Sequence, residues 1–314
     1  MKTRFVLNPI SGRNRRRPRL AGAIREFIAA RALDADLVVT EGPGHATELA
    51  RAAVQAGHQL VVAVGGDGTM NEVAQGLIDT PAALALVPCG SGNGLALHLG
   101  LPRTTLGALR LAAGEDGRVA SVDTGFVNGR PFFNAMGLGL DAEVSERFNR
   151  LTRRGLPAYA RTAWRAIREA ASHRCTIVGG GREIALDVLL VAVTNSDQYG
   201  NNARIAPGAR VDDGALDLVA VRPVGLPGAA ALTARMFLGR LDGSPDVVRL
   251  RGAEFSIRRA AAGLVHTDGE TQTMAATVNV AVHPRSLRVL IPAASRAVAP
   301  HTAPSGARLA LQFP

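Results

Sequence analysis

The segment Val61–Glu72 constrains the fold most, because an apolar strand runs into glycines and then directly into a helix. It reads Val61-Val62-Ala63-Val64-Gly65-Gly66-Asp67-Gly68-Thr69-Met70-Asn71-Glu72. Thr69 and Glu72 have capping-box spacing, which predicts a helix N-terminus whose free N–H groups face the glycine turn. Glycines also let the main chain approach a ligand closely. Residues 65–71, the first glycine loop, therefore predict a phosphate site at the end of a strand.

Asp67 is the residue that sharpens this interpretation. In an ordinary strand-to-helix turn the glycines would relieve backbone strain and Asp67 would cap a neighbour. That alternative does not explain why an acid occupies a phosphate-binding turn, where it repels the phosphate. The acid is tolerable if Mg2+ lies between it and the phosphate, or if it takes a proton from an attacking hydroxyl.

Residues 88–94, the second glycine loop, repeat the design. Pro88-Cys89-Gly90-Ser91-Gly92-Asn93-Gly94 leads from the apolar strand Ala83–Val87 into a helix that starts at Leu95. A plain turn explains this loop equally well when it is taken alone. Ligands of open parallel sheets bind beyond the carboxyl ends of the strands, so the two loops are expected to converge on one polyphosphate.

A third strand, within residues 5–12, is followed by the polar turn Asn8-Pro9-Ile10-Ser11-Gly12. Asn8 and Ser11 are ligand candidates because they follow the strand's end. The five arginines between Arg13 and Arg19 are expected to form a flexible, solvated loop.

The order of elements predicts two domains. Strands and helices alternate over residues 1–120, which predicts an α/β domain with a parallel sheet. Short strands with tight turns follow over residues 121–292, which predicts a mainly antiparallel β domain. Whether its last strand returns to the first sheet is left open. Residues 293–314 are expected to form a flexible tail. The predicted elements are strands Arg4–Asn8, Leu37–Thr40, Leu60–Val64, Ser121–Val127, Phe132–Met136, Cys175–Val178, Ile184–Thr194, Leu216–Val221, Glu254–Arg258 and Thr277–His283, a hairpin turn at Asn128-Gly129, and helices Leu20–Ala32, Ala46–Ala56, Met70–Ile78, Thr105–Ala113, Ala142–His173 and Ala229–Gly239.

Charge and composition exclude several classes of protein. The formal net charge is +10, so the surface attracts anions such as nucleotides, nucleic acids or anionic lipids. Lys2 is the single lysine among the 36 lysine and arginine residues. P-loop NTPases and protein kinases are therefore excluded, because both bind the nucleotide phosphates with a lysine inside a motif that this chain lacks. Two cysteines in different contexts suggest neither a disulfide framework nor a zinc site. No membrane-spanning run or signal peptide is recognised, so a cytoplasmic location is expected.

The helical stretch within Ala142–His173 is unusually basic. A solvated helix face explains it, and a membrane-facing surface is the alternative, on the inner face of the membrane. Its arginines are Arg147, Arg150, Arg153, Arg154, Arg161, Arg165 and Arg168, and Tyr159 and Trp164 lie among them.

An ordered set of motifs gives the chain a family resemblance. From about Arg4 to Pro292 it resembles the bacterial diacylglycerol kinase and sphingosine kinase-like lipid kinases, although the first glycine loop alone also resembles NAD kinases and phosphofructokinases. The motifs are Asn8-Pro9 with Ser11-Gly12, Gly65 to Glu72, Gly90 to Asn93, Asp123-Thr124-Gly125, Asp213-Gly214 and Asp268-Gly269-Glu270. Gly94 stands where many diacylglycerol kinases of this group have aspartate, and in this the loop is closer to that of sphingoid-base kinases.

The resemblance implies ATP and Mg2+ as cofactors and assigns roles to residues. Asp67 would help to hold the catalytic Mg2+, and Glu270 matches the catalytic base. Asp123, the third implied catalytic residue, matches an acid at the interdomain cleft that would orient the substrate or a metal ion. Without the family, Glu270 is equally well explained as an acid in a hairpin turn. The implied nucleotide-binding residues are Asn8, Ser11, Thr40, Gly65, Gly66, Asp67, Gly68, Thr69, Asn71, Glu72, Gly90, Ser91, Gly92 and Asn93.

A second metal site is implied in the β domain. The stretch Pro207–Leu216 resembles a structural Mg2+ site formed by Asp213 with backbone oxygens near Arg210 and Ala215. A tight turn before a strand explains the same residues.

These observations predict an ATP-dependent kinase that phosphorylates a lipid hydroxyl, such as diacylglycerol or a sphingoid base, at a membrane surface. An NAD kinase-like enzyme and a non-catalytic lipid-binding protein are the rivals. No specific nucleic-acid partner is expected, and a homodimer is left open.

Overall fold

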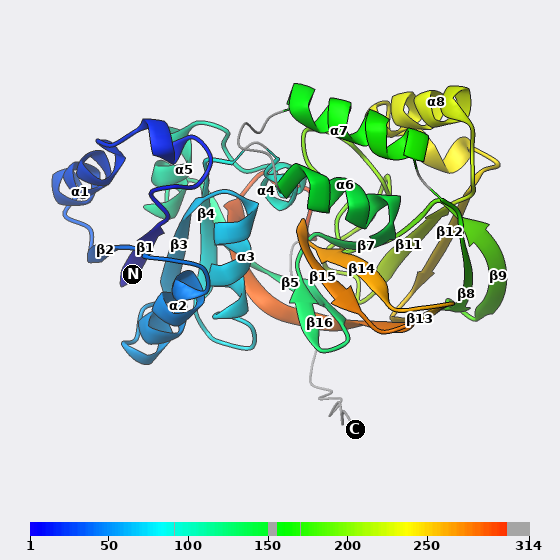
Figure 1. The fold of residues 1–314 in the computed structure, drawn as a ribbon. Coiled ribbons are helices and arrows are strands. Elements are labelled where there is room, and N and C mark those ends of the chain that lie inside the picture. Colours follow the sequence, from blue (N-terminus) through cyan, green and yellow to red (C-terminus); the bar gives the residue numbers. More distant parts are fainter. Residues whose placement is uncertain (91, 150–155, 170, 300–314) are drawn as a thin grey trace.

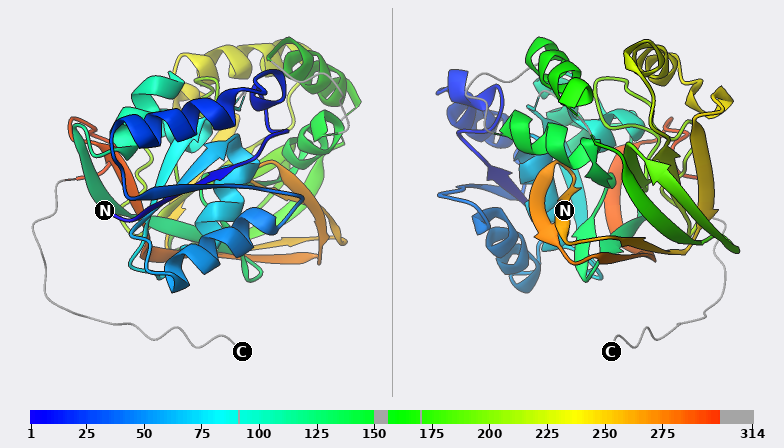
Figure 2. Two further views of the ribbon diagram at one scale, coloured as in Figure 1. Left: turned by 90° about the vertical axis from the view of Figure 1, so that its left-hand side faces the viewer. Right: turned by 45° about the vertical axis from the view of Figure 1, so that its right-hand side comes forward.

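Four parallel strands and the helices on both faces of their sheet form the first lobe of the computed structural model (Figures 1 and 2). The structure describes residues 1–90, 92–149, 156–169 and 171–299. The strand order is β2-β1-β3-β4. The strands are β1 (Thr3–Leu7), β2 (Ala35–Val39), β3 (Leu60–Gly65) and β4 (Ala83–Pro88), and the helices are α1 (Leu20–Ala30), α2 (His45–Gln55), α3 (Asp67–Gln75), the short α4 (Gly94–His98) and α5 (Thr105–Ala112).

Hydrophobic patterning explains this lobe. Every residue of β3 is buried, as expected for a parallel strand that is covered on both faces. In α2 the buried positions are Ala46, Ala50 and Ala53, which recur at the spacing of a single helix face. The parallel α/β domain predicted from the sequence is confirmed.

The second lobe is an antiparallel β-sandwich with helices on one outer face (Figure 2). A six-stranded sheet of order β12-β11-β10-β7-β14-β15 packs on the strands β16-β13-β8-β9. The helices α6 (Leu140–Asn149), α7 (Leu156–Glu169) and α8 (Leu226–Phe237) lie over the six-stranded sheet. The strands are β7 (Ala135–Gly139), β8 (His173–Gly179), β9 (Arg182–Val188), β10 (Leu190–Thr194), β11 (Leu216–Val221), β12 (Val247–Gly252), β13 (Glu254–Arg259), β14 (Gly263–Thr267), β15 (Glu270–Met274) and β16 (Thr277–Pro292).

Strand β16 connects the two lobes. Its first half pairs with β13, and near its end Arg288 and Val289 pair in parallel with β4. Along most of its length it also pairs with β5 (Gly117–Val127), with a bulge between His283 and Leu287. One 16-residue strand therefore fixes the position of the β-sandwich relative to the first sheet.

Several predicted elements differ in the structure. The predicted strand Ile184–Thr194 divides at Leu189 into β9 and β10, which belong to different sheets. The predicted strand Phe132–Met136 likewise divides into β6 (Arg130–Phe132) and β7. The first division falls inside the apolar run of residues 188–193, where hydrophobicity marks burial but not the sheet to which a residue belongs. The second falls at Phe133 and the polar Asn134, which lie between the two strands.

Other predictions about local structure have mixed outcomes. The Asn128-Gly129 hairpin is confirmed, with φ of 46° and 80° at the two residues and Val127 paired with Arg130. The predicted helix Ala142–His173 corresponds to α6 and α7, and residues 150–155 between them lie outside the described residues. Within the described part of the chain, no helix is long and apolar enough to cross a membrane.

Candidate active site

The ends of β1, β3 and β4 meet at one edge of the first sheet, and their turns are in contact. The Gly66 N–H donates to Oγ of Ser11 at 2.8 Å. Gly12 has a φ of +51°, and a Cβ there would lie 2.3 Å from the carbonyl oxygen of Cys89. A side chain at Gly12 would therefore force the first turn away from the second glycine loop.

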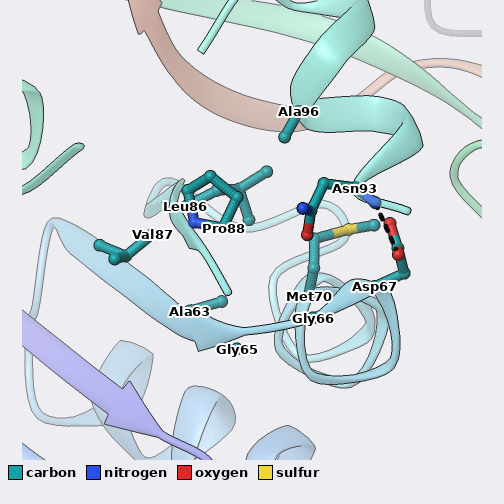
Figure 3. Close-up of a pocket in the computed structure, with 10 residues that line it drawn as sticks. All are labelled: Ala63, Gly65, Gly66, Asp67, Met70, Leu86, Val87, Pro88, Asn93 and Ala96. Carbon is teal, nitrogen blue, oxygen red and sulfur yellow. Dashed lines mark hydrogen bonds between the residues drawn. The ribbon is translucent and has the colours of Figure 1, made fainter. Parts of the chain in front are cut away.

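The two glycine loops pack main chain against main chain. A Cβ on Gly90 would lie 2.8 Å from Cα of Gly66, so this approach requires glycine. The Asp67 carboxylate accepts hydrogen bonds from the N–H groups of Asn93 at 2.9 Å and Gly94 at 3.1 Å (Figure 3). A small pocket between the loops is lined by Gly66, Asp67 and Asn93 among others. The sequence prediction that the loops converge is confirmed.

Asp67 has two opposing influences on its charge. Desolvation by the surrounding loops raises the pKa of its carboxyl, and the N–H groups of Asn93 and Gly94 partly offset that effect. In this arrangement Asp67 caps the start of α4, which is the structural role considered as an alternative in the sequence analysis. Each carboxylate oxygen retains a lone pair after these bonds.

The fit of Asp67 to Mg2+ follows from this chemistry. Kinase Mg2+ ions are usually held by one or two carboxylates together with substrate phosphates and water. A single carboxylate at the edge of a phosphate-binding turn fits that pattern. No cluster of three or more acidic, histidine or cysteine residues gathers in the described ranges, so a metal site made only of protein ligands is not found there.

The capping-box prediction for Thr69 is wrong. Helix α3 begins at Asp67, because Gly66 is extended (φ −96°, ψ −168°) and takes the N-cap position. Thr69 therefore lies within the first turn, and its buried Oγ1 has no partner among the described residues. The Glu72 carboxylate instead accepts a hydrogen bond from the N–H of Ala46 at the start of α2. The unpaired hydroxyl of Thr69 is suited to a ligand that enters the loop.

The other predicted nucleotide residues are distributed around this edge. Asn8 accepts a hydrogen bond from the N–H of Ile10, and Thr40 is buried just after β2. Gly92 lies against Asp67, since a Cβ there would be 3.1 Å from its Oδ2. Asn71 points toward the second lobe, and Ser91 lies outside the described residues. Their assignments to nucleotide remain predictions.

Asp268 anchors the hairpin that carries Glu270, a role that sequence reasoning missed. Residues 268–269 form a tight turn between β14 and β15, with φ of 49° and 90°. The Asp268 carboxylate accepts hydrogen bonds of 2.7–2.9 Å from four N–H groups, which belong to Asn71, Phe133, Asn134 and Ala135. Asn71 is on α3 of the first lobe, so this carboxylate links the hairpin to the first glycine loop.

Glu270, which the second lobe supplies, lies against the first glycine loop. Its Oε1 lies 3.7 Å from the position of a Cβ on Gly68. The side chain is exposed to solvent, yet the surrounding protein desolvates it enough to raise the pKa, and the charges of Glu72 and Asp268 raise it further. A carboxylate with a raised pKa beside a phosphate-binding loop is suited to proton transfer.

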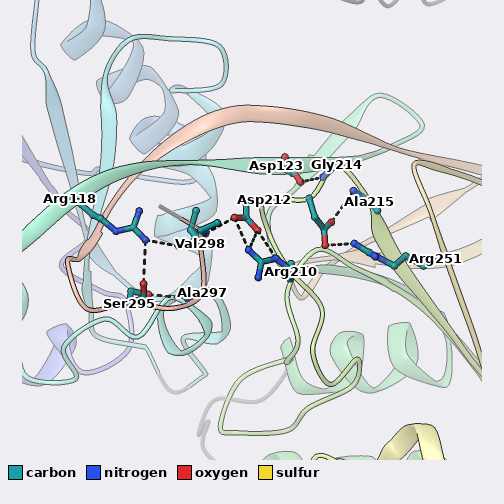
Figure 4. Close-up of polar contacts among 12 residues, drawn as sticks. Arg118, Asp123, Arg210, Asp212, Gly214, Ala215, Arg251, Ser295, Ala297 and Val298 are labelled. Atoms are coloured by element: carbon teal, nitrogen blue, oxygen red, sulfur yellow. Dashed lines mark hydrogen bonds and ion pairs between the residues drawn. The ribbon is translucent and has the colours of Figure 1, made fainter. Parts of the chain in front are cut away.

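Asp123 is an acid on β5. It is completely buried, and its oxygens accept hydrogen bonds from the N–H groups of Gly214 at 2.8 Å and Arg285 at 2.7 Å (Figure 4). Burial raises the pKa of this carboxyl. Asp123 therefore joins the bulge of β16 to the turn at residues 213–214, and its predicted catalytic role remains a prediction.

The residues of the second predicted metal site are engaged with one another. Asp213 accepts a hydrogen bond from the N–H of Ala215 and forms an ion pair with Arg251 (Figure 4). Arg210 pairs with the neighbouring Asp212. Because the guanidinium of Arg251 already neutralises Asp213, these residues as arranged do not fit a metal ion, and we derive no chemistry from one. The assignment of Arg210, Asp213 and Ala215 remains a sequence prediction.

Comparison with known proteins places this architecture in a class. Residues 2–127 match the diacylglycerol kinase catalytic domain, and residues 134–291 match the YegS C-terminal NAD kinase beta sandwich-like domain. A probable YegS-like lipid kinase of Pseudomonas fluorescens is 30% identical over 266 residues, which cover 82% of this chain and 86% of the relative. A diacylglycerol kinase of Bacillus subtilis is 30% identical over 72% of this chain and 75% of its own length.

Solved structures show the same fold. A diacylglycerol kinase from Bacillus anthracis has a TM-score of 0.72 at 21% identity and covers 95% of this chain and 98% of its own. An NAD kinase from Archaeoglobus fulgidus in complex with ATP has a TM-score of 0.51 at 13% identity and covers 92% and 93%. The fold and the glycine loops thus define a kinase. The chain belongs to the family of diacylglycerol kinases and YegS-like lipid kinases.

Proposed function

We propose that this kinase transfers the γ-phosphoryl group of ATP to a lipid hydroxyl held between the first glycine loop and Glu270. The position of Glu270, whose Oε1 lies 3.7 Å from the place of a Cβ on Gly68, is the observation that carries the proposal. The glycine loops belong to the first lobe, and the base-bearing hairpin belongs to the second. An acceptor bound between Gly68 and Glu270 would meet both groups at once.

The proposed reaction needs one proton acceptor and several donors toward phosphate. The hydroxyl oxygen of the lipid attacks the γ-phosphorus, the bond from that phosphorus to the bridging oxygen of ADP breaks, and Glu270 takes the hydroxyl proton. N–H groups of the glycine loops and the free hydroxyl of Thr69 bind the phosphates. Mg2+, when bound through Asp67, would neutralise phosphate charge.

The acceptor is the finer part of the proposal. Related proteins are named diacylglycerol kinase and lipid kinase, which supports a lipid with a free hydroxyl. Gly94 stands where many diacylglycerol kinases have aspartate, and a Cβ there would lie 2.7 Å from Nδ2 of Asn134 and 2.9 Å from the carbonyl oxygen of Tyr199. This packing leaves no room for an aspartate side chain, and the loop keeps the form that is closer to sphingoid-base kinases. A sphingoid base therefore stands beside diacylglycerol as a candidate acceptor.

A membrane-facing surface on α7 completes the proposal. Trp164 is 45% exposed on this helix, and Arg165 and Arg168 are exposed beside it, whereas Arg147 on α6 is paired with Glu143 and Glu169. An aromatic ring with neighbouring arginines suits the interface of an anionic bilayer. The expected behaviour is peripheral binding to anionic vesicles that weakens as salt is added. Salt-independent binding, or its absence, would contradict this part.

A phosphorylation assay with labelled ATP tests the proposal as a whole. Wild-type protein is given diacylglycerol micelles, sphingosine micelles and NAD in parallel, and Asp67→Asn serves as the inactive comparison. We expect Mg2+-dependent label in at least one lipid and none in NAD, with turnover reduced by orders of magnitude in Asp67→Asn. Label in NAD alone would favour the NAD kinase-like function, and ATP-independent lipid binding without label would favour a carrier.

A further inference from the structure

Half-buried Tyr199 and the buried Asp141 and His266 form a polar cluster at the hairpin that carries Glu270. His266 on β14 is 3% exposed and Asp141 in the first turn of α6 is 7% exposed. Tyr199 comes from the segment between β10 and β11. None of the three has a part in the proposed phosphoryl transfer, although burial of an acid and an imidazole is costly unless the pair is well satisfied.

The three side chains contact one another directly. The Tyr199 hydroxyl donates to Oδ2 of Asp141 at 2.6 Å. Nε2 of His266 lies 2.9 Å from the same oxygen, in an ion-pair contact off the ideal hydrogen-bond direction. The Tyr199 and His266 rings also meet edge to face, with centroids 6.5 Å apart. Each member thus touches the other two.

The strand beneath the cluster is shaped to admit it. Gly137 on β7 pairs with His266 across the sheet. A Cβ on Gly137 would lie 2.0 Å from Oδ2 of Asp141 and 2.6 Å from Nε2 of His266. Only glycine at this position lets the acid and the imidazole approach, so the sequence is adapted to the contact.

The cluster reaches Glu270 through the turn of the hairpin. The N–H of Gly269, the residue before Glu270, donates to Nδ1 of His266 at 3.3 Å. This bond needs an unprotonated Nδ1, and the carboxylate of Asp141 beside Nε2 favours the tautomer that carries its proton there. The orientation of the imidazole is therefore set by Asp141 and passed to the backbone next to the base.

The same cluster reaches the second glycine loop through Tyr199. Its carbonyl oxygen lies 2.9 Å from the position of a Cβ on Gly94, and a Cβ on the next residue, Gly200, would lie 3.1 Å from the main chain of Gly92. The main chain of Tyr199 thus lies against the second glycine loop, and its hydroxyl contacts Asp141. A continuous series of contacts runs from Gly94 to Gly269.

We infer that Tyr199, Asp141 and His266 are positioning residues that hold Glu270 in place relative to the second glycine loop. The inference rests on the proposed role of Glu270 as the base. The proposed function of the cluster is to align the proton acceptor with the nucleotide. Its contacts reach the base indirectly, by way of Gly269. Misplacement of a catalytic group by about 1 Å costs up to about 100-fold in rate, so modest displacement is measurable.

The test combines Tyr199→Phe, which removes one hydroxyl and keeps the ring, with Glu270→Gln. The matched control is Ser286→Ala, which removes a buried hydroxyl that hydrogen-bonds Thr124 elsewhere in the sandwich. We expect Tyr199→Phe to lower kcat about 10-fold, with the KM for ATP changed less than about 2-fold. In the Glu270→Gln background the same change should lower kcat less than about 2-fold, because the group being positioned is gone. Ser286→Ala should leave kcat unchanged in both.

Each other result has a definite meaning. An equal loss in both backgrounds, or no loss in either, overturns the positioning role while Glu270 remains the base. If Glu270→Gln alone keeps wild-type turnover, the proposed base is wrong and the inference falls with it. Asp141→Asn, which keeps shape and removes charge, provides a second variant should Tyr199→Phe fold poorly, and the same criteria apply to it.

Discussion

Replacement of Asp268 by asparagine is predicted to destabilise the protein strongly. The carboxylate accepts four N–H hydrogen bonds, two on each oxygen. An amide supplies one accepting oxygen and one NH2 group, so two N–H donors lose their acceptor and face another donor. Hydrogen bonds to a charged group are worth about 1.5–3 kcal/mol each, which gives a loss of about 3–6 kcal/mol. Because Asp268 is partly exposed, we expect the loss in the free energy of unfolding to lie at the low end of this range, about 3 kcal/mol.

Urea unfolding followed by fluorescence and circular dichroism measures this loss. The matched control is Asp36→Asn, an acid that is 45% exposed and paired with Arg4, where the loss should stay below about 1 kcal/mol. Asn71→Ala should remove the hydrogen bond that joins Asp268 to α3 of the first lobe, and the double variant should show coupling between the two residues. A free energy of unfolding for Asp268→Asn within about 1 kcal/mol of wild type would refute the reasoning.

Three further predictions follow from particular residues. The acid limb of kcat/KM should lie above pH 4.5, because the base must be ionised and desolvation by the surrounding protein raises the pKa of Glu270. Glu72→Gln removes a like charge near Glu270, so a pH profile of this variant should show the limb at lower pH. Gly94→Ala should cost about 1–3 kcal/mol in urea unfolding, since its Cβ meets Asn134 and Tyr199. Gly22→Ala, in open space within α1, should instead stabilise by about 0.5–1 kcal/mol, which the same titration can show.

The fold class, and the edge of the first sheet where the two glycine loops meet, could be predicted because their signals are local. Apolar strands followed by glycines mark the ends of β3 and β4, and the rule for parallel sheets places those ends together. Asp67 and the Asn128-Gly129 hairpin were found in the same way. Local signals failed where two candidates competed for one role, as at the start of α3, where extended Gly66 takes the cap in place of Thr69.

The contacts between the lobes could not be derived from sequence patterns. Asn71 and Asp268 are 197 residues apart, and neither carries a periodic signal for the other. The position of Glu270 opposite Gly68 depends on the path of β16 between the sheets. The sequence left open a return of the last strand to the first sheet, but the predicted strand ended at His283, whereas β16 continues to Pro292. Such features arise from long-range packing, and the family resemblance, rather than residue patterning, directed attention to Glu270.

The turnover of Glu270→Gln, measured together with ATP affinity, tests the central claim most directly. The glycine loops should still bind nucleotide, because no hydrogen bond joins Glu270 to the second glycine loop among the described residues, and Asp67 links the two loops without it. We therefore expect kcat to fall about 100- to 10,000-fold, the usual contribution of a general base, with the KM and Kd for ATP nearly unchanged. A parallel fall in ATP affinity and turnover would instead place Glu270 among the nucleotide or metal ligands, and unchanged turnover would show that it is not the base.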